Sequence, residues 1–511
     1  MQHRFFVFLH TLVLVAVVGA LATGLRLSTI SRDTWLWLDG LLPAGRVHIW
    51  HAFFAVLLLI ATLGYVFYRF RTVSSRRKKS LRYHTLVQYG GYAVLLILIV
   101  TGVLQTLDYR LPHAALHYYA ALGLILYLVL HAYVYFLQWG KALLARIWVP
   151  TGQIKLLFAL GSVACVSFVT TLWLNHDLVR PLSVAKLDPL TAIDIDGKAD
   201  EAFWQTAPQV DIVTRAGANF TDGSTPVSVK AVSNGSESYF LFRWHDSTQS
   251  LTHLPLVKTA EGWKVTENGF YRFDERSHYE DKFAVMLSPS CQLGGDGTAF
   301  LGRQPLAYKP ANWHGKGYHA ALDGVTRDLW HWKAIRTNDM FLADDNYFAA
   351  PVAPRTGERR YTAGYQTDGK ESGAYVMNWQ WYRNTTVVPK RVPLESTTAQ
   401  TDSVLPWFGA KPYQAREDHY PLGSQLPSVL YRSNRFEGDR ADVRARAQWH
   451  DGVWTLEMAR KNHTGSSHDV ALDSGVCMWV AAFDGAQIAH THHQMALQLN
   501  YPASISTKEV L

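Results

Sequence analysis

Five long apolar runs separated by short polar segments make up the first third of the chain. They cover about residues 5–27, 47–70, 86–107, 114–137 and 154–174. Each run reaches the roughly 20 residues that a helix needs to cross a bilayer. Beyond residue 175 the pattern changes to short runs in which every second residue is apolar, with Gly, Asn and Asp between them. The pattern predicts a membrane α-helical bundle followed by an all-β soluble domain.

The alternating runs of the second part indicate an antiparallel sandwich, since a period of two is typical of half-buried strands. We expect residues 1–150 to form a bundle of four helices and residues 151–176 to add a fifth helix that tethers the outer domain. A linker is predicted over residues 177–189, and the β-sandwich over residues 190–511. A long aromatic stretch from about 340 to 435 reads as an irregular insertion with short strands.

The formal net charge is +8, and the basic residues gather in short loops between the apolar runs. The most basic loop lies between Arg69 and Arg82, which predicts that this loop is cytoplasmic. Five spans then place the N-terminus in the cytoplasm and the soluble domain outside, in the periplasm of a bacterium with the bundle in its inner membrane. This distribution favours a lipid bilayer as partner and no nucleic acid.

The number and spacing of the three cysteines exclude some kinds of cofactor site. The sequence has no Cys-x-x-Cys-His, so it offers no site for a covalent c-type haem, and it has no Cys-x-x-Cys pair of the kind that holds zinc or an iron–sulfur cluster. Cys165 lies in an apolar run. Cys291 and Cys477 lie in the soluble domain, where pairing is compatible with an oxidising compartment but is left open by the sequence.

Four histidines lie within the apolar runs at matching depths. His117 and His131 are 14 residues apart, which on a helix places them on roughly one face and about 21 Å apart along its axis. His51 lies early in the second run, at the depth of His117, and His10 early in the first run, at the depth of His131. Intramembrane imidazoles are costly and usually face the bundle interior, so two pairs of haem ligands are predicted.

His48 stands three residues before His51. It is an alternative ligand to His51, or a candidate for a quinol site, because it lies near the same predicted membrane edge. A single intramembrane histidine could also be a hydrogen-bonded residue of the helix-bundle core that binds no metal. Four histidines matched in depth across three helices favour ligation over that reading.

Residues 1–175 resemble the di-haem cytochrome b subunits of membrane formate dehydrogenases and nickel–iron hydrogenases. The resemblance rests on these positions: His10 after an Arg-Phe-Phe start, His51-Ala-Phe-Phe, Thr101-Gly102, and His117 with His131. It implies that the matching histidines ligate two b haems and that quinone reacts near one of them. The likeness is weaker over the fifth run.

Several short sequence segments in the second part of the chain, the predicted outer domain, resemble the haem-binding γ subunits of ethylbenzene dehydrogenase and related dimethyl-sulfide dehydrogenases. They are 195–204, 242–246, 280–285, 328–333 and 449–457, of which Asp328-Leu-Trp-His-Trp-Lys333 is the most specific. The resemblance implies a β-sandwich that holds one b haem between a Met and a Lys.

The outer half departs from that ligand pattern. Gly317-Tyr-His319 stands near the family's Met position, and His490-Thr-His492-His493 stands near its Lys position. We therefore expect a bis-histidine site made by His319 and His492. In a strand, His490 would share a face with His492, and His493 would take the other. The alternatives left open are His490, His493, Met286 and Lys333, together with a haem-free domain whose histidines lie on the surface.

These observations predict a b-type cytochrome that exchanges electrons between the quinone/quinol pool and a periplasmic redox partner. Its cofactors would be two haems in the membrane and a third outside. By resemblance, the partner would be a molybdenum enzyme or a c-type cytochrome. The alternative is a membrane-tethered module whose sandwich binds a ligand or acts as a sensor, but an anchor of this kind needs no depth-matched histidines.

Overall fold

The computed structural model describes most of the chain in two compact units. The described residues are 2–29, 32, 34–72, 82–113, 115–140, 154–191, 193–267, 275–296, 320–352, 364–367, 375–382, 386–394, 404–432 and 438–502. One unit comprises Met1–Leu178 with Gln292–Phe300, and the other comprises Val179–Cys291 with Leu301–Leu511. Each unit is described by itself.

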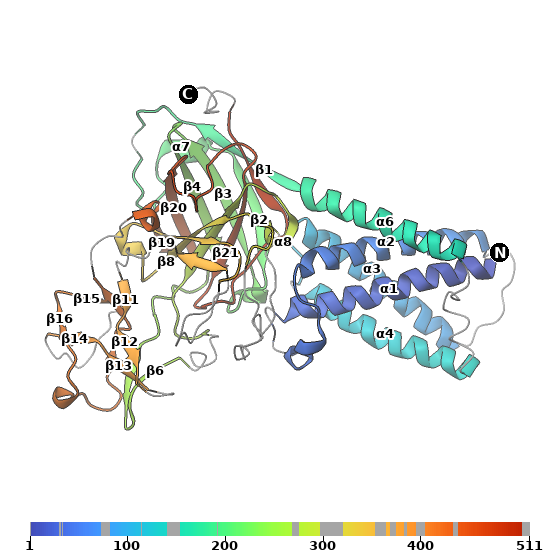
Figure 1. Cartoon of the computed structure of the whole chain (residues 1–511), viewed down its shortest axis with the longest axis horizontal. Coiled ribbons are helices and arrows are strands. Elements are labelled where there is room, and N and C mark those ends of the chain that lie inside the picture. Colours follow the sequence, from blue (N-terminus) through green and yellow to red (C-terminus); the bar gives the residue numbers. More distant parts are fainter. Residues whose placement is uncertain are drawn as a thin grey trace. The chain divides into compact units, whose positions relative to one another are not determined.

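The described part of the first unit contains five long helices that run side by side (Figure 1). They are α1 (Gln2–Ser28), α2 (Val47–Thr72), α3 (Arg82–Thr106), α4 (Leu116–Trp139) and α6 (Ile154–Asp177). Each contains an apolar stretch of 22 to 24 residues, long enough to cross a bilayer. The prediction of five long apolar helices is confirmed, since each helix coincides with one apolar run.

The first unit, called the helical unit below, has a small interior, and much of its apolar surface faces outward. Leu9, Ala16, Leu57 and Leu124 are among the buried residues of its core. Large apolar side chains on every helix point away from the protein, as do those of Leu63, Leu96, Leu126 and Phe158. Water would not tolerate so much exposed apolar surface, whereas lipid would cover it.

The second unit is built on one long folded sheet. Among the described residues it contains twelve strands, in the order β10-β9-β8-β7-β21-β22-β1-β3-β4-β20-β19, with β2 paired to β3. The strands are β1 (Val179–Lys186), β2 (Gln209–Arg215), β3 (Ser224–Ser233), β4 (Glu237–His245), β7 (Lys282–Ser288), β8 (Arg327–Lys333), β9 (Asp344–Phe348), β10 (Tyr365–Thr367), β19 (Arg444–His450), β20 (Val453–Lys461), β21 (Cys477–Phe483) and β22 (Ala496–Asn500).

The two halves of this sheet face each other across an aromatic core. Phe242 and Trp244 of β4 contact Phe283 of β7, with ring centroids 4.9 and 4.7 Å apart. Trp330 and Trp332 of β8 are fully buried in the same cluster. The sandwich predicted from the alternating runs is confirmed, because every second residue of these strands enters this core.

Strand β1 differs from the sequence prediction. Residues 179–186 were expected to lie in a linker, yet they form a central strand that pairs in parallel with both β22 and β3. Leu182 and Val184 point into the core and are buried. Pro181 has no N–H group to donate to a neighbouring strand, and proline is uncommon in central strands, so the short alternation around it is a weak signal for a strand. These two parallel pairings also make the sheet mixed rather than wholly antiparallel.

Short strands from two parts of the chain form smaller sheets in the second unit. One sheet contains β5 (Leu256–Thr259), β6 (Gly262–Val265), β12 (Trp379–Trp381), β13 (Val387–Pro389) and β17 (Gln425–Leu426); another contains β11 (Tyr375–Met377), β15 (Val404–Pro406) and β18 (Val429–Tyr431); and a third pairs β14 (Arg391–Pro393) with β16 (Ala410–Pro412). The predicted insertion is therefore not self-contained, because β9 and β10 extend the main sheet and β5 and β6 precede the insertion.

Candidate functional site

His51 and His117 are brought together in the helical unit. His51 projects from α2 and His117 from α4, and their ring centroids are 6.4 Å apart with the ring planes at 87°. Two imidazoles that share one metal ion, each through a metal–nitrogen bond of about 2 Å, have ring centroids roughly 6 Å apart. The separation of these two rings therefore fits a single iron between them.

A threonine orients each of the two imidazoles. The Thr23 hydroxyl lies 2.9 Å from Nδ1 of His51, and the Thr101 hydroxyl lies 2.9 Å from Nδ1 of His117. Each hydroxyl donates its one proton to a carbonyl of its own helix, Thr23 to Gly19 at 2.7 Å and Thr101 to Ile97 at 2.6 Å. The hydroxyl can then only accept from Nδ1–H, which leaves the lone pair of Nε2 for a metal.

A glycine follows each of these threonines and lets the helix approach the imidazole. A Cβ atom on Gly24 would lie 3.1 Å from Cε1 of His51, and one on Gly102 would lie 3.4 Å from Cε1 of His117. The arrangement thus occurs twice, from α1 to α2 and from α3 to α4. The sequence analysis used Thr101-Gly102 but missed Thr23-Gly24, although the repeated Thr-Gly dipeptide was a signal that could have revealed it.

His131 and His10 form the second pair of the helical unit. His10 of α1 lies near enough to influence the imidazole of His131 electrostatically. The Tyr127 hydroxyl lies 3.1 Å from Nδ1 of His131, one turn earlier on α4, and the Tyr135 ring lies 4.8 Å from the His131 ring. The structure thus brings the rings of His51 and His117 together and places His10 near His131, while haem ligation by either pair stays a prediction. His48 lies instead beside a small cavity with Arg46 and Asn175.

In the second unit, called the soluble unit below, the strands β7, β8 and β21 have a second face on the side opposite to the sandwich core. Their register places Ala284 beside His331 and Ala481, and Met286 beside Leu329 and Trp479. Met286 packs in an apolar cluster that includes Phe348 and the cysteines Cys291 and Cys477. These two cysteines form a disulfide, which answers the question that their sequence left open.

The C-terminal histidines do not lie in a strand, which is the condition under which His490 and His492 would share a face. Residues 490–494 are irregular, with one bridge between His492 and Arg215, so their faces do not alternate as in a strand. His493 accepts a hydrogen bond at Nε2 from the Val480 N–H and donates from Nδ1 to the Met495 carbonyl, both at 2.9 Å. Both ring nitrogens are used by the backbone, so His493 is unsuited to hold iron.

The other residues considered for the outer site differ in what surrounds them. Nδ1 of His490 lies 2.8 Å from the Thr491 carbonyl, to which it donates. The His492 side chain is half-buried. The Lys333 amine is ion-paired with Asp344 and donates to the Tyr375 hydroxyl at 3.1 Å, which leaves it poorly placed as a ligand. His319 lies outside the described residues.

His331 is a functional candidate that the sequence analysis missed. Both of its ring nitrogens are buried and have no hydrogen-bond partner among the described residues. Its ring stacks on Phe483 at 5.3 Å, and burial holds the pKa of its imidazole well below the usual range, with Lys333 and Lys282 adding to the effect. A neutral imidazole is the form that ligates iron. The signal was its place within Asp328-Leu-Trp-His-Trp-Lys333.

Comparison with known proteins bears on the soluble unit. The family model described as "Ethylbenzene dehydrogenase" matches residues 201–495, more than half of the chain. The chain belongs to the ethylbenzene dehydrogenase family. The family match covers the sheet from β2 to β21, including His331 on β8, and the C-terminal histidines up to Met495, whereas β1 and β22 lie outside the matched residues. It confirms the resemblance of the outer half, whereas the cytochrome b resemblance of the first half stays a prediction.

No curated protein matches this member of the ethylbenzene dehydrogenase family. Solved structures similar to it include a suggested carbohydrate-binding protein from Bacteroides uniformis ATCC 8492, with 9% identity, a TM-score of 0.25 and coverage of 63% of this chain and 100% of that chain. A family 9 carbohydrate-binding module from Caldicellulosiruptor kristjanssonii, in complex with glucose, has 8% identity, a TM-score of 0.23 and coverage of 63% and 96%. At such TM-scores the likeness adds nothing on fold or function.

Proposed function

We propose that this protein is a membrane-bound b-type cytochrome that carries electrons between the quinone/quinol pool and a redox partner outside the membrane. The observation that carries the proposal is the His51–His117 pair with its two orienting threonines. When bound, haem would supply the one-electron chemistry of its iron. The chain supplies ligands, their orientation and an environment that excludes water.

Two b haems would lie in the helical unit, one held by His51 and His117 and the other by His10 and His131. Thr23 and Thr101 would fix the outer pair of rings, because a hydrogen bond at Nδ1 sets both the tautomer and the orientation of a ligating histidine. Tyr127 would do the same for His131. The apolar helix surfaces around them keep the local dielectric low.

A third b haem would bind the soluble unit, as membership of the ethylbenzene dehydrogenase family suggests. The unpartnered nitrogens of His331 support this residue as one axial ligand, in place of the family's Met or Lys. His490, His492 and His319 are the candidates for the other ligand. His490 has the hydrogen bond from Nδ1 to a carbonyl that is common among ligating histidines.

Two features support an orientation with the soluble unit in the periplasm of a bacterium and the bundle in its inner membrane. The most basic loop, between Arg69 and Arg82, favours the cytoplasm for the segment between α2 and α3. The Cys291–Cys477 disulfide favours an oxidising compartment for the soluble unit. A periplasmic molybdenum enzyme or c-type cytochrome would then exchange electrons with the outer haem.

The reduced-minus-oxidised spectrum of the purified full chain tests the proposal, together with its haem content. About three b haems per chain are expected. His51→Ala and His117→Ala should each lose the same haem, while His113→Ala, on the surface before α4, should lose none. Absence of haem would sink the electron-transfer proposal in favour of a tethered binding module. A measured content of two haems per chain would contradict only the proposed haem site of the soluble unit.

A further inference from the structure

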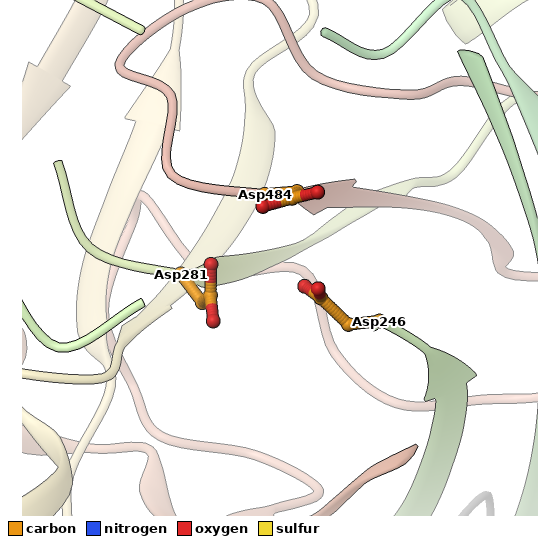
Figure 2. Close-up of side chains that lie close together, drawn as sticks. All are labelled: Asp246, Asp281 and Asp484. Carbon is orange, nitrogen blue, oxygen red and sulfur yellow. The ribbon is translucent and has the colours of Figure 1, made fainter. Parts of the chain in front are cut away.

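Three buried aspartates from separate segments meet at one end of the sandwich. Asp246 follows β4, Asp281 precedes β7 and Asp484 follows β21. Their exposed fractions are 1%, 0% and 5%. Each offers one carboxylate oxygen, and these oxygens lie within 4.8 Å of one another. Figure 2 shows the three carboxylates turned toward a common space.

Among the described residues, the groups that donate hydrogen bonds to these three carboxylates are all neutral. Asp281 accepts from the Ser250 N–H at 2.7 Å and the Gly485 N–H at 2.9 Å, and Asp246 accepts from the Thr248 N–H at 3.1 Å. No described lysine or arginine pairs with any of the three. Buried charge without a counter-ion is costly, so this cluster needs protons or a cation.

One oxygen points specifically to a missing partner. Oδ2 of Asp246 is buried and has no hydrogen-bond partner within the described ranges. Figure 2 shows the Asp246 carboxylate directed toward Asp281 rather than toward its own strand. A bare carboxylate oxygen is rarely left in a protein interior, because its desolvation is not repaid.

A second acidic cluster of the same unit provides a comparison. Asp328, Asp345 and Asp469 also offer three close oxygens. Arg460 is ion-paired with Asp328 and lies 3.9 Å from Asp469, so the chain supplies its own cation there. The cluster of Asp246, Asp281 and Asp484 has no equivalent of Arg460 in the described part of the chain.

We propose that Asp246, Asp281 and Asp484 bind one calcium ion. Calcium takes oxygen ligands at about 2.3–2.6 Å, so any two ligands of one ion lie within about 5 Å of each other, as these oxygens do. The absence of nitrogen and sulfur ligands in the cluster disfavours zinc or copper. Magnesium is disfavoured because it rarely uses a dedicated cage of protein ligands. The N–H donors of Ser250 and Gly485 would orient the ligating carboxylates.

The ion would join the two halves of the sandwich. Asp246 extends β4, which pairs with β3 and β20, whereas Asp281 and Asp484 extend the neighbouring strands β7 and β21. The Trp454 indole donates to Asp281 at 3.2 Å, so an aromatic side chain from β20 also reaches the site. Calcium would therefore stabilise the contact between the halves at this end.

Terbium luminescence tests the site, because terbium replaces calcium and is excited through a nearby indole such as that of Trp454. The purified full chain is treated with a chelator, titrated with terbium and then with calcium or magnesium. We expect one terbium per chain that calcium displaces, and at least tenfold weaker binding in Asp246→Asn. Asp451→Asn, whose carboxylate is 88% exposed in the β19–β20 turn, should bind as the wild type.

Wild-type terbium binding that calcium does not displace, or equal binding by Asp246→Asn, would overturn the proposal. If that variant does not fold, the melting temperature of the wild type decides. It should rise on adding calcium to the chelated protein and not on adding equal magnesium. A melting temperature indifferent to calcium would also overturn the proposal, whatever the haem content of the chain.

Discussion

At the scale of single residues, short polar side chains determine what the candidate sites can bind. Thr23 and Thr101 have no charge and bind no metal themselves, yet each sets which nitrogen of its histidine carries the proton. His493 and His331 show the same principle with opposite outcomes. Backbone groups use both nitrogens of His493, while the described residues leave both nitrogens of His331 available.

Replacing Thr23 by Val should alter one haem without removing it. Val has nearly the shape of Thr but cannot accept from Nδ1–H, so the ligand becomes less basic and the ferric form less stable. We expect the midpoint potential of the haem at His51 and His117 to rise, with up to tenfold weaker haem binding. A spectroscopic redox titration measures both. Thr171→Val, which removes a buried hydroxyl bonded to Ser167 on α6, should leave all potentials unchanged.

His331→Ala should remove the outer haem while both membrane haems remain. The expected loss is one haem of about three per chain, seen in the visible spectrum and the haem titration. His450→Ala, with an imidazole that is 88% exposed, serves as the control. If His331→Ala retains every haem, His331 is not a ligand, and His319 and His492 become the candidate pair again.

The aspartate cluster should make stability depend on pH when calcium is absent. Burial and mutual repulsion raise the pKa of Asp246 to about 7 and that of Asp281 to about 8. The folded state therefore holds protons that the unfolded state releases above about pH 4, and folding is penalised as pH rises through 7 and 8. With chelator present, Asp246→Asn should match the wild type in melting temperature near pH 4 and exceed it at pH 8.

The same protons should compete with calcium. At pH 6 both carboxyls are largely protonated in the folded state, whereas at pH 8 Asp246 is largely ionised and Asp281 is about half ionised. Calcium affinity, measured by displacement of terbium, should therefore increase several-fold from pH 6 to pH 8. Binding that is equal at the two pH values would show that protonation does not oppose the ion.

At the scale of helices and strands, close approach at glycine determines how the membrane helices pack. A Cβ on Gly91 of α3 would lie 2.3 Å from the Tyr127 ring of α4, whereas a Cβ on the neighbouring Gly90 would meet nothing within 4 Å. Tyr127 is also the residue that contacts Nδ1 of His131. The packing of α3 on α4 is therefore coupled to the position of one imidazole.

Gly91→Ala and Gly90→Ala form a matched pair that tests this coupling. Alanine favours a helix over glycine by up to about 1 kcal/mol, so Gly90→Ala should leave stability unchanged or slightly raised. Gly91→Ala should lower the melting temperature in detergent and shift the spectrum of the haem at His10 and His131, because Tyr127 must move. Identical behaviour of the two variants would contradict the close packing of Tyr127 on α3.

At the scale of the whole molecule, the sequence predicts helices and strands better than it predicts contacts between residues that are far apart in the chain. The five long helices follow from long apolar runs, and the approach of His51 to His117 follows from their matched depths. Strand β1 was missed because Pro181 hid its alternation, and the irregular path of residues 490–494 gave no local sign. Asp246, Asp281 and Asp484 are far apart in the sequence, so only the folded sheet reveals their cluster.

The disulfide acts at this larger scale, because Cys291 and Cys477 are 186 residues apart. Replacing both by Ser should lower the free energy of unfolding of the soluble unit by about 2–5 kcal/mol, since a long loop in the unfolded chain is no longer closed. Thermal or denaturant unfolding of the full chain would measure the loss. Cys165→Ser, which removes the exposed free cysteine of α6, should leave the soluble unit unaffected.

Strand β1 has a consequence for how the protein is made. It is the first strand of the sheet to be synthesised, and one of its two neighbours, β22, is the last. The described sheet is therefore incomplete until residues 496–500 have left the ribosome, and until then β1 and β21 each have an unpaired edge. A premature stop codon shortly before Ala496 would spare every predicted membrane span and every described candidate haem ligand, yet it would leave a chain prone to aggregation.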